Sequence, residues 1–181
     1  MSRDRSTVRV TVTRGVHVGA DRLWQVISTP GYLELCHPFC ERNPVRRWPG
    51  DDAEDTIHYS GGRVVQRRFT AWLEGTGYDL VVVDNVGVEQ ARVRWRIEPE
   101  SNGACRFTVS LHVLFLDHLP DAVRWVSYRL VVRPQMKRYL EAVVAGVVHY
   151  AETGEPVVRN QFGSHRWFSP ARLAADSVSK K

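Results

Sequence analysis

The sequence predicts an α+β domain in which a long C-terminal helix covers one face of an antiparallel β-sheet. Between residues 55 and 115, apolar and polar side chains alternate in segments separated by short turns. This period of two is typical of strands that bury one face. Residues 134–153 instead carry one apolar stripe with helical spacing, made of Met136, Leu140, Val143, Val147 and Tyr150. The stripe is too apolar to face water, so we expect the sheet to cover it.

One strand and two short helices are predicted before this sheet. Apolar residues at every second position indicate the first strand, namely Val8, Val10 and Val12. Gly15 is expected to introduce a bulge or bend after it. The first helix begins near Gly19 and has an apolar side formed by Leu23, Trp24, Val26 and Ile27. The second covers residues 32–36, and a corner follows because the residue before Pro38 avoids helical backbone.

Five strands are predicted after a loop that begins at Trp48. They occupy residues 56–60, 63–74, 78–83, 88–98 and 105–115. Gly61 and Gly62 are expected to form a two-residue hairpin turn. All connections are short, so neighbouring strands should pair antiparallel. Arginines alternate with apolar residues in the fourth of these strands, which predicts a sheet with one polar and one apolar face.

Three residues are expected to shape the long helix. An apolar stripe precedes it, made of Leu119, Val123, Val126 and Leu130. Pro134 lacks an amide hydrogen and should kink or break the helix near Arg133. Gly146 lies mid-helix, where glycine costs about 1 kcal/mol relative to alanine. We expect it either to allow close approach to the sheet or to leave room for a ligand. Gly154 should end the helix.

Composition predicts one domain with one core. The chain has 181 residues, of which 43% are hydrophobic. We expect a single domain at residues 1–153 and an extension at 154–181 that packs on it and frays at its end. No apolar run reaches the length of a membrane span, and the N-terminus lacks the apolar segment of a secretory signal. Three cysteines predict a cytoplasmic protein. The net charge of +5 is dispersed, which argues against nucleic-acid binding.

Two stretches carry a family resemblance that spans residues 8–153. Residues 18–27 (VGADRLWQVI) resemble the first strand of the START-like, or SRPBCC, superfamily as it enters a first helix that bears a tryptophan. Residues 134–153 resemble its closing helix. The nearest branches are the polyketide cyclase/dehydrase-like and lipid-transfer proteins. The resemblance implies the helix-grip fold, in which a curved antiparallel sheet wraps around the C-terminal helix. It also implies a cavity between them, which holds sterols, lipids, polyketides or plant hormones in different members.

The leading hypothesis is that this cavity binds a small hydrophobic ligand of lipid or polyketide type. The residues expected to line it are His37, Phe39, Tyr59, Phe69, Trp72, Trp95, Phe107, Met136, Tyr139 and Val143. No cofactor, metal or membrane insertion is expected, and a homodimer is left open. The first alternative is a polyketide cyclase/dehydrase-like enzyme that uses the same cavity, but no catalytic motif or catalytic residue is assigned. The second is a protein-interaction module with Phe162, Trp167 and Phe168 as anchors.

Several polar residues admit two interpretations. Cys36, His37 and Cys40 have the spacing of zinc ligands, but no second pair accompanies them, so packing at a corner is favoured. Arg67 and Arg68 alternate on one strand, so one of them points inward; we expect both to reach solvent by snorkelling. The adjacent Asp117 and His118 could act as an acid-base pair, but helix capping by the aspartate is the simpler interpretation.

Overall fold

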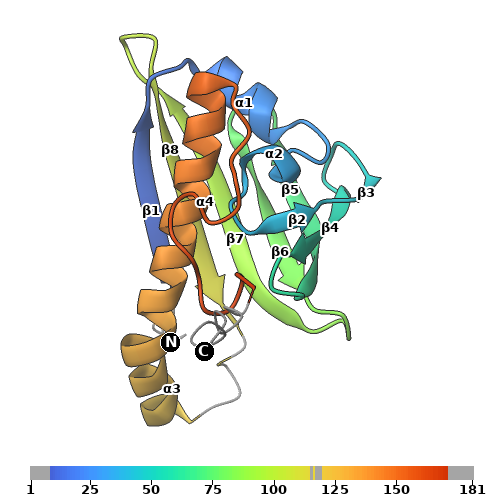
Figure 1. Ribbon diagram of the computed structural model, residues 1–181, viewed down its shortest axis with the longest axis vertical. Helices are drawn as coiled ribbons and strands as arrows, with labels where there is room; N and C mark the ends of the chain where they lie inside the picture. Colours follow the sequence, from blue (N-terminus) through green and yellow to red (C-terminus); the bar gives the residue numbers. More distant parts are fainter. Residues whose placement is uncertain (1–8, 115, 117–119, 171–181) are drawn as a thin grey trace, which may run out of the picture.

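Eight antiparallel strands form one curled sheet in the computed structural model, which describes residues 9–114, 116 and 120–170 (Figure 1). The strand order is β1-β8-β7-β6-β5-β4-β2, and β3 pairs with β4. The strands are β1 (Arg9–Val16), β2 (Cys40–Arg42), β3 (Val45–Arg47), β4 (Glu54–Tyr59), β5 (Val64–Leu73), β6 (Gly77–Val83), β7 (Glu89–Pro99) and β8 (Cys105–Val113). The helical segments are α1 (Ala20–Ile27), α2 (Leu33–Cys36), α3 (Asp121–Ser127), a π-helical turn (Tyr128–Val132) and α4 (Arg133–Thr153).

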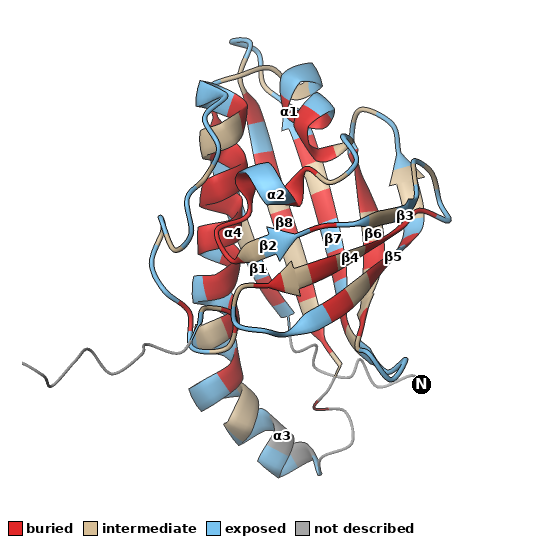
Figure 2. Ribbon diagram, turned by 45° about the vertical axis from the view of Figure 1, so that its right-hand side comes forward, coloured by how far each residue is buried: buried red, intermediate tan, exposed pale blue. Residues whose placement is uncertain are grey.

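The long helix α4 lies across one face of the sheet, where it packs against β1, β8 and the short helices α1 and α2 (Figure 1). Buried residues alternate with more exposed ones along the strands, and they cover the middle of α4, where residues 142–148 are all buried (Figure 2). The predicted α+β fold, with a curved sheet around a C-terminal helix, is confirmed. No helix among the described residues is long and apolar enough to cross a membrane.

Period-two patterning explains why the sheet has one apolar face. On β7 the buried residues are Ala91, Val93, Trp95 and Ile97. On β8 they are Cys105, Phe107, Val109, Leu111 and Val113. Because successive strand residues point to opposite faces, the intervening arginines of β7 lie on the outer face. There Arg94 and Arg96 form ion pairs with Asp79. The predicted polar, arginine-rich face is therefore confirmed.

Three local features of the strands differ from what the sequence predicted or were not predicted. Gly15 causes no bulge, because β1 pairs with β8 without a register shift as far as Val16. The short strands β2 and β3 were not predicted, since three residues are too few to show a period. The turn after β4 contains three residues rather than two, because the Tyr59 amide donates to the Arg63 carbonyl across Ser60, Gly61 and Gly62. Val8 and Phe115, which were predicted in strands, lie outside the described residues, as do Asp117, His118 and Leu119.

The predicted break near Pro134 does not occur. Instead α3 continues through the π-helical turn into α4, where Pro134 occupies the first turn. A regular α-helix would need an amide at residue 134 to bond the Leu130 carbonyl, and proline has none. The wider spacing, in which the Arg133 amide bonds the Tyr128 carbonyl, accommodates the proline without a break. The predicted apolar stripe before the proline is exposed at Val123, Val126 and Leu130.

Gly146 allows a close approach, but to a different element from the one predicted. A Cβ at this position would lie 2.1 Å from the Cys36 carbonyl oxygen and 3.2 Å from Cδ of Pro38. The glycine therefore lets the corner after α2 rest directly on α4, and it leaves no room for a ligand there. Gly154 ends α4 in the left-handed conformation, with φ of 74°, as predicted.

The segment after α4 runs back along the domain, past α2, to the turn between β4 and β5. The Val157 amide donates to the Leu35 carbonyl, and the Asn160 amide donates to the Pro38 carbonyl. Further along, the Gly61 amide donates to the Phe168 carbonyl, beside the β4–β5 turn. These bonds place the Phe168 ring in the core, where it is 7% exposed. Phe168 is therefore not available as an anchor for a protein partner.

Candidate functional site

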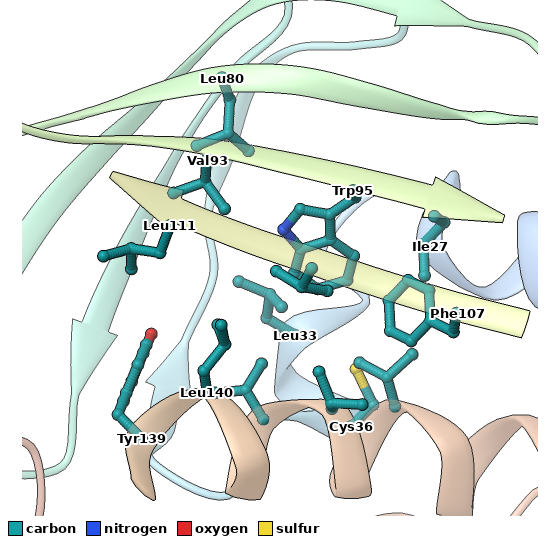
Figure 3. Packing of buried hydrophobic residues seen from close by; sticks show 14 of the residues in the cluster. Ile27, Leu33, Cys36, Leu80, Val93, Trp95, Phe107, Leu111, Tyr139 and Leu140 are labelled. Carbon is teal, nitrogen blue, oxygen red and sulfur yellow. The ribbon is translucent and has the colours of Figure 1, made fainter. Parts of the chain in front are cut away.

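A cavity of about 450 Å³ lies between the sheet and α4. Its walls are mainly aliphatic and aromatic side chains from α2, strands β4 to β8, α4 and the segment after α4. Figure 3 shows Leu80, Val93 and Leu111 of the sheet facing Tyr139 and Leu140 of α4, with the Tyr139 hydroxyl directed toward the sheet. Cavities of this size and character accommodate small organic molecules.

Six of the ten predicted cavity residues line this space: His37, Tyr59, Trp95, Met136, Tyr139 and Val143. They come together because side chains from the corner after α2, from β4 and β7 and from α4 border the same space. Tyr59 is inward and 5% exposed, as its alternation with Ile57 on β4 indicated, while His58 between them points to the outer face. These six residues lie on both the sheet side and the α4 side of this space.

The other four predicted residues are packed elsewhere in the core. Phe69 and Trp72 belong to an aromatic cluster with Trp48, whose ring centroid is 5.1 Å from the centroid of each. Phe107 packs edge-on against Trp95, at 5.3 Å between centroids. Phe39 stacks against the outer side of Tyr139. Aromatic side chains pack equally well against one another and against a ligand, so residue type alone could not separate the two roles.

One end of the cavity contains a buried ion pair that was not expected. Arg67 is 3% exposed and Asp55 is 1% exposed. Arg67 donates two hydrogen bonds to the Asp55 carboxylate, one of them from Nε to Oδ1 at 2.7 Å. A third runs from its Nη1 to the Tyr32 hydroxyl, 3.0 Å away, and this hydroxyl lies 2.5 Å from that of Tyr78. The expectation that both Arg67 and Arg68 reach solvent was wrong for Arg67, because Asp55 lies opposite it on β4.

The carboxylate keeps this arginine charged inside the core. Burial lowers the pKa of Arg67, but the adjacent Asp55 outweighs burial and holds this pKa well above its usual value. Burial raises the pKa of Tyr32 to about 12, despite the opposing effect of Arg67. At neutral pH the cluster therefore contains one balanced ion pair and neutral hydroxyls, with no net charge offered to the cavity.

A second polar cluster lies where α4 faces β4. The Phe39 amide donates to Nδ1 of His37 at 3.2 Å, and Nε2 of His37 lies 3.2 Å from the Tyr139 hydroxyl. The Tyr139 hydroxyl lies 2.8 Å from the Tyr59 hydroxyl. Burial lowers the pKa of His37 to about 3, an effect that Arg67 reinforces. Burial raises the pKa of Tyr59 to about 12, so the whole cluster is neutral at pH 7.

Comparison with protein families gives one match, which covers most of the domain. The model described as "Polyketide cyclase / dehydrase and lipid transport" matches residues 7–152. The chain belongs to this polyketide cyclase/dehydrase and lipid transport family. The SRPBCC resemblance noted in the sequence is thereby confirmed. A search of curated protein sequences gives no match.

Several solved structures have the same fold as this chain. DynU16, a protein of the dynemicin biosynthetic locus, has a TM-score of 0.63 and 17% identity, over 84% of this chain and 51% of its own. StfQ, a di-domain ARO/CYC of the steffimycin biosynthetic pathway, has a TM-score of 0.63 and 13% identity, over 83% and 51%. This chain therefore spans about half the length of either protein. Norcoclaurine synthase from Thalictrum flavum has a TM-score of 0.55 and 16% identity, over 82% and 96%. These likenesses establish the helix-grip fold.

In this member of the polyketide cyclase/dehydrase and lipid transport family, part of the cavity wall lies beyond the matched region. Trp167 and Phe168 line the cavity, and the Phe168 ring centroid is 4.4 Å from that of Tyr139 and 4.6 Å from that of Tyr59. Arg63 and Gln90, which also line it, remain partly or fully exposed, so they mark the mouth. The extension was expected to pack on the domain, but its aromatic residues were considered as anchors for a protein partner and not as part of the cavity wall. Nothing in its spacing showed that the chain returns to the sheet.

The cysteines contribute to packing at the corner after α2. Cys36 is fully buried, and Cys40 donates a hydrogen bond from Sγ to the Arg42 carbonyl. Burial raises the pKa of both thiols, that of Cys40 to about 12. Within the part of the chain that the structure describes, no three His, Cys, Asp or Glu side chains are grouped as metal ligands.

The neutral His37 predicts an acid-sensitive fold. Its pKa is about 3 in the folded protein and 6.5 in an unfolded chain, so between these values the unfolded state binds the additional proton. Stability should therefore decrease as the pH falls below about 6, by up to about 1.4 kcal/mol per pH unit from this residue. Urea unfolding of the wild type and of His37→Gln between pH 4 and 8 measures the slope. We expect a shallower slope in the variant, and equal slopes would contradict the assignment.

Proposed function

We propose that the protein binds one small, largely apolar molecule in the cavity between the sheet and α4. The observation that carries the proposal is the cavity itself, a space of about 450 Å³ with aliphatic and aromatic walls. Removing the apolar surface of a ligand from water contributes about 25 cal/mol per Å². Membership of a family whose description includes lipid transport supports this proposal.

The protonation states favour binding over proton transfer. A cyclase or dehydrase activity, which the family description also includes, is helped most by a group that titrates near neutral pH. In the cavity His37 has a pKa of about 3 and Tyr59 a pKa of about 12. Both groups therefore keep their protons fixed at pH 7, and they serve better as hydrogen-bonding groups than as acid or base.

We also propose that residues 154–170 are part of the binding domain. Their backbone bonds to Leu35, Pro38 and Gly61 hold Trp167 and Phe168 against the cavity. Without them the space beside Tyr59 and Tyr139 would open to solvent. This segment supports the proposal of a single ligand-binding unit more directly than that of a strip for a protein partner.

Filling the cavity should abolish binding. Leu111 projects into it from β8, so in Leu111→Trp the larger side chain should occupy the space of the ligand. We expect the affinity for the neutral fluorescent probe N-phenyl-1-naphthylamine to fall at least about tenfold, which corresponds to about 1.4 kcal/mol. A fluorescence titration measures it, and circular dichroism checks the fold.

The adjacent residue provides the control. His112 is next to Leu111 on β8 but lies on the outer face of the sheet, so His112→Trp adds the same side chain outside the cavity. This variant should bind the probe as the wild type does. If the wild type does not bind the probe, or if Leu111→Trp binds it equally well, the proposed function is wrong.

A further inference from the structure

The hydrogen bonds of the His37 cluster have a defined direction. A backbone amide can only donate, so Nδ1 of His37, which accepts from the Phe39 amide, carries a lone pair. The ring is buried and neutral, so it holds its one hydrogen on Nε2. That hydrogen is donated to the Tyr139 oxygen, 3.2 Å away.

The next hydrogen bond, between Tyr139 and Tyr59, has the same direction of donation. A hydroxyl that accepts one hydrogen bond becomes a better donor, so the Tyr139 hydroxyl is expected to donate onward to the Tyr59 oxygen at 2.8 Å. The Tyr59 hydroxyl then accepts from Tyr139 and keeps its own hydrogen. Among the described residues, Tyr139 provides the one hydrogen bond that this hydroxyl makes. The hydrogen of Tyr59 is therefore left for a partner in the cavity, which both tyrosines line.

The electrostatics near Tyr59 determine which partner fits. The buried guanidinium of Arg67 is already neutralised by Asp55, and Arg63 is exposed at the mouth, with its guanidinium 5.8 Å from the centroid of the Phe168 ring. The interior thus offers a neutral donor and no unpaired cation among the described residues. A carboxylate buried there would lose its hydration, and the other cation that lines the cavity, Arg63, is exposed at the mouth, where water screens its charge. A neutral carbonyl needs only one donor.

We propose that Tyr59 donates a hydrogen bond to a neutral carbonyl oxygen of the bound ligand, so that the cavity selects apolar ketones over carboxylates of similar size. Tyr139 and His37 are positioning residues, because they act through Tyr59 by fixing where its hydrogen points. This inference rests on the proposed function, and it names the chemical class of the ligand for the same cavity.

Three naphthalenes of similar shape test the inference: 2-acetylnaphthalene, 2-ethylnaphthalene and 2-naphthoate. Each is titrated at pH 7 as a competitor of N-phenyl-1-naphthylamine, with the wild type and with Tyr59→Phe. A neutral hydrogen bond contributes about 0.5–1.5 kcal/mol, so the variant should bind the ketone about three- to tenfold more weakly relative to the hydrocarbon. In the wild type, 2-naphthoate should bind at least about tenfold more weakly than the ketone.

A matched tyrosine provides the control. The Tyr78 hydroxyl is also buried and bonded to another tyrosine, but its side chain does not line the cavity. Tyr78→Phe should leave the ratio of ketone to hydrocarbon affinity unchanged. If Tyr59→Phe leaves that ratio unchanged, or if 2-naphthoate binds as tightly as the ketone, the inference is overturned while binding in the cavity stands. If no naphthalene and no probe binds, the proposed function fails and the inference fails with it.

Discussion

Replacing Gly146 with alanine should destabilise the protein by about 3 kcal/mol. The added Cβ would lie 2.1 Å from the Cys36 carbonyl oxygen, far inside van der Waals contact. The obstacle is backbone at the corner between α2 and β2, which is itself held by hydrogen bonds from the segment after α4. It cannot rotate away as a side chain would, so α4 must move from the corner. Alanine has a higher helix propensity than glycine, so propensity alone would predict a more stable variant. The expected loss of stability therefore reports the clash with the Cys36 carbonyl.

Gly15→Ala is the control for this prediction. Gly15 lies on β1, and a Cβ there would meet no atom within 4 Å. We expect its effect to stay within about 0.5 kcal/mol. Urea unfolding followed by circular dichroism compares both variants with the wild type. A Gly146→Ala protein as stable as the wild type would show that α4 and the corner do not touch in this way.

Replacing Arg67 with methionine should cost about 3–5 kcal/mol of stability, because the Asp55 carboxylate would remain buried without its partner. The same change removes the hydrogen bond that Arg67 donates to the Tyr32 hydroxyl. Arg68→Met is the control, since Arg68 follows on the same strand but is exposed. Its effect should be within about 0.5 kcal/mol.

A double variant shows how much of the lost stability comes from leaving the Asp55 carboxylate unpaired. In Arg67→Met with Asp55→Leu, no charge is left unpaired, and apolar replacement of a buried ion pair is often nearly neutral. We expect it to regain most of the stability that the single variant loses. A double variant no more stable than Arg67→Met would show that the unpaired Asp55 carboxylate is not the main cost of losing Arg67.

The sheet could be predicted because its pattern is local. Alternation within a single strand, such as Ala91, Val93, Trp95 and Ile97 on β7, already shows which face is buried, and it does not depend on the partner strand. The stripe on α4 is equally local. Together they predicted a one-sided sheet covered by a helix. With the family resemblance, they also placed Tyr59 and Tyr139 among the residues expected to line one cavity.

The buried ion pair escaped prediction because of a single residue in one turn. In a two-residue turn at Gly61 and Gly62, Asp55 would lie opposite Arg68. The turn contains three residues, and Asp55 lies opposite Arg67 instead. A shift of one residue reverses the face on which a strand side chain lies. The turn therefore determines which arginine lies opposite Asp55, whereas the buried position of Arg67 follows from its alternation with Val65 and Phe69 on β5.

The cavity wall formed by Trp167 and Phe168 has a consequence for how this fold acquires specificity. The family pattern ends at residue 152, whereas these two side chains arrive from a segment beyond it. Two homologues could then share every residue of the region that the family model matches and still bind ligands of different shape. On the proposed function, grafting this short terminal stretch from one homologue onto another should change which ligands the cavity accepts, without any change to the sheet.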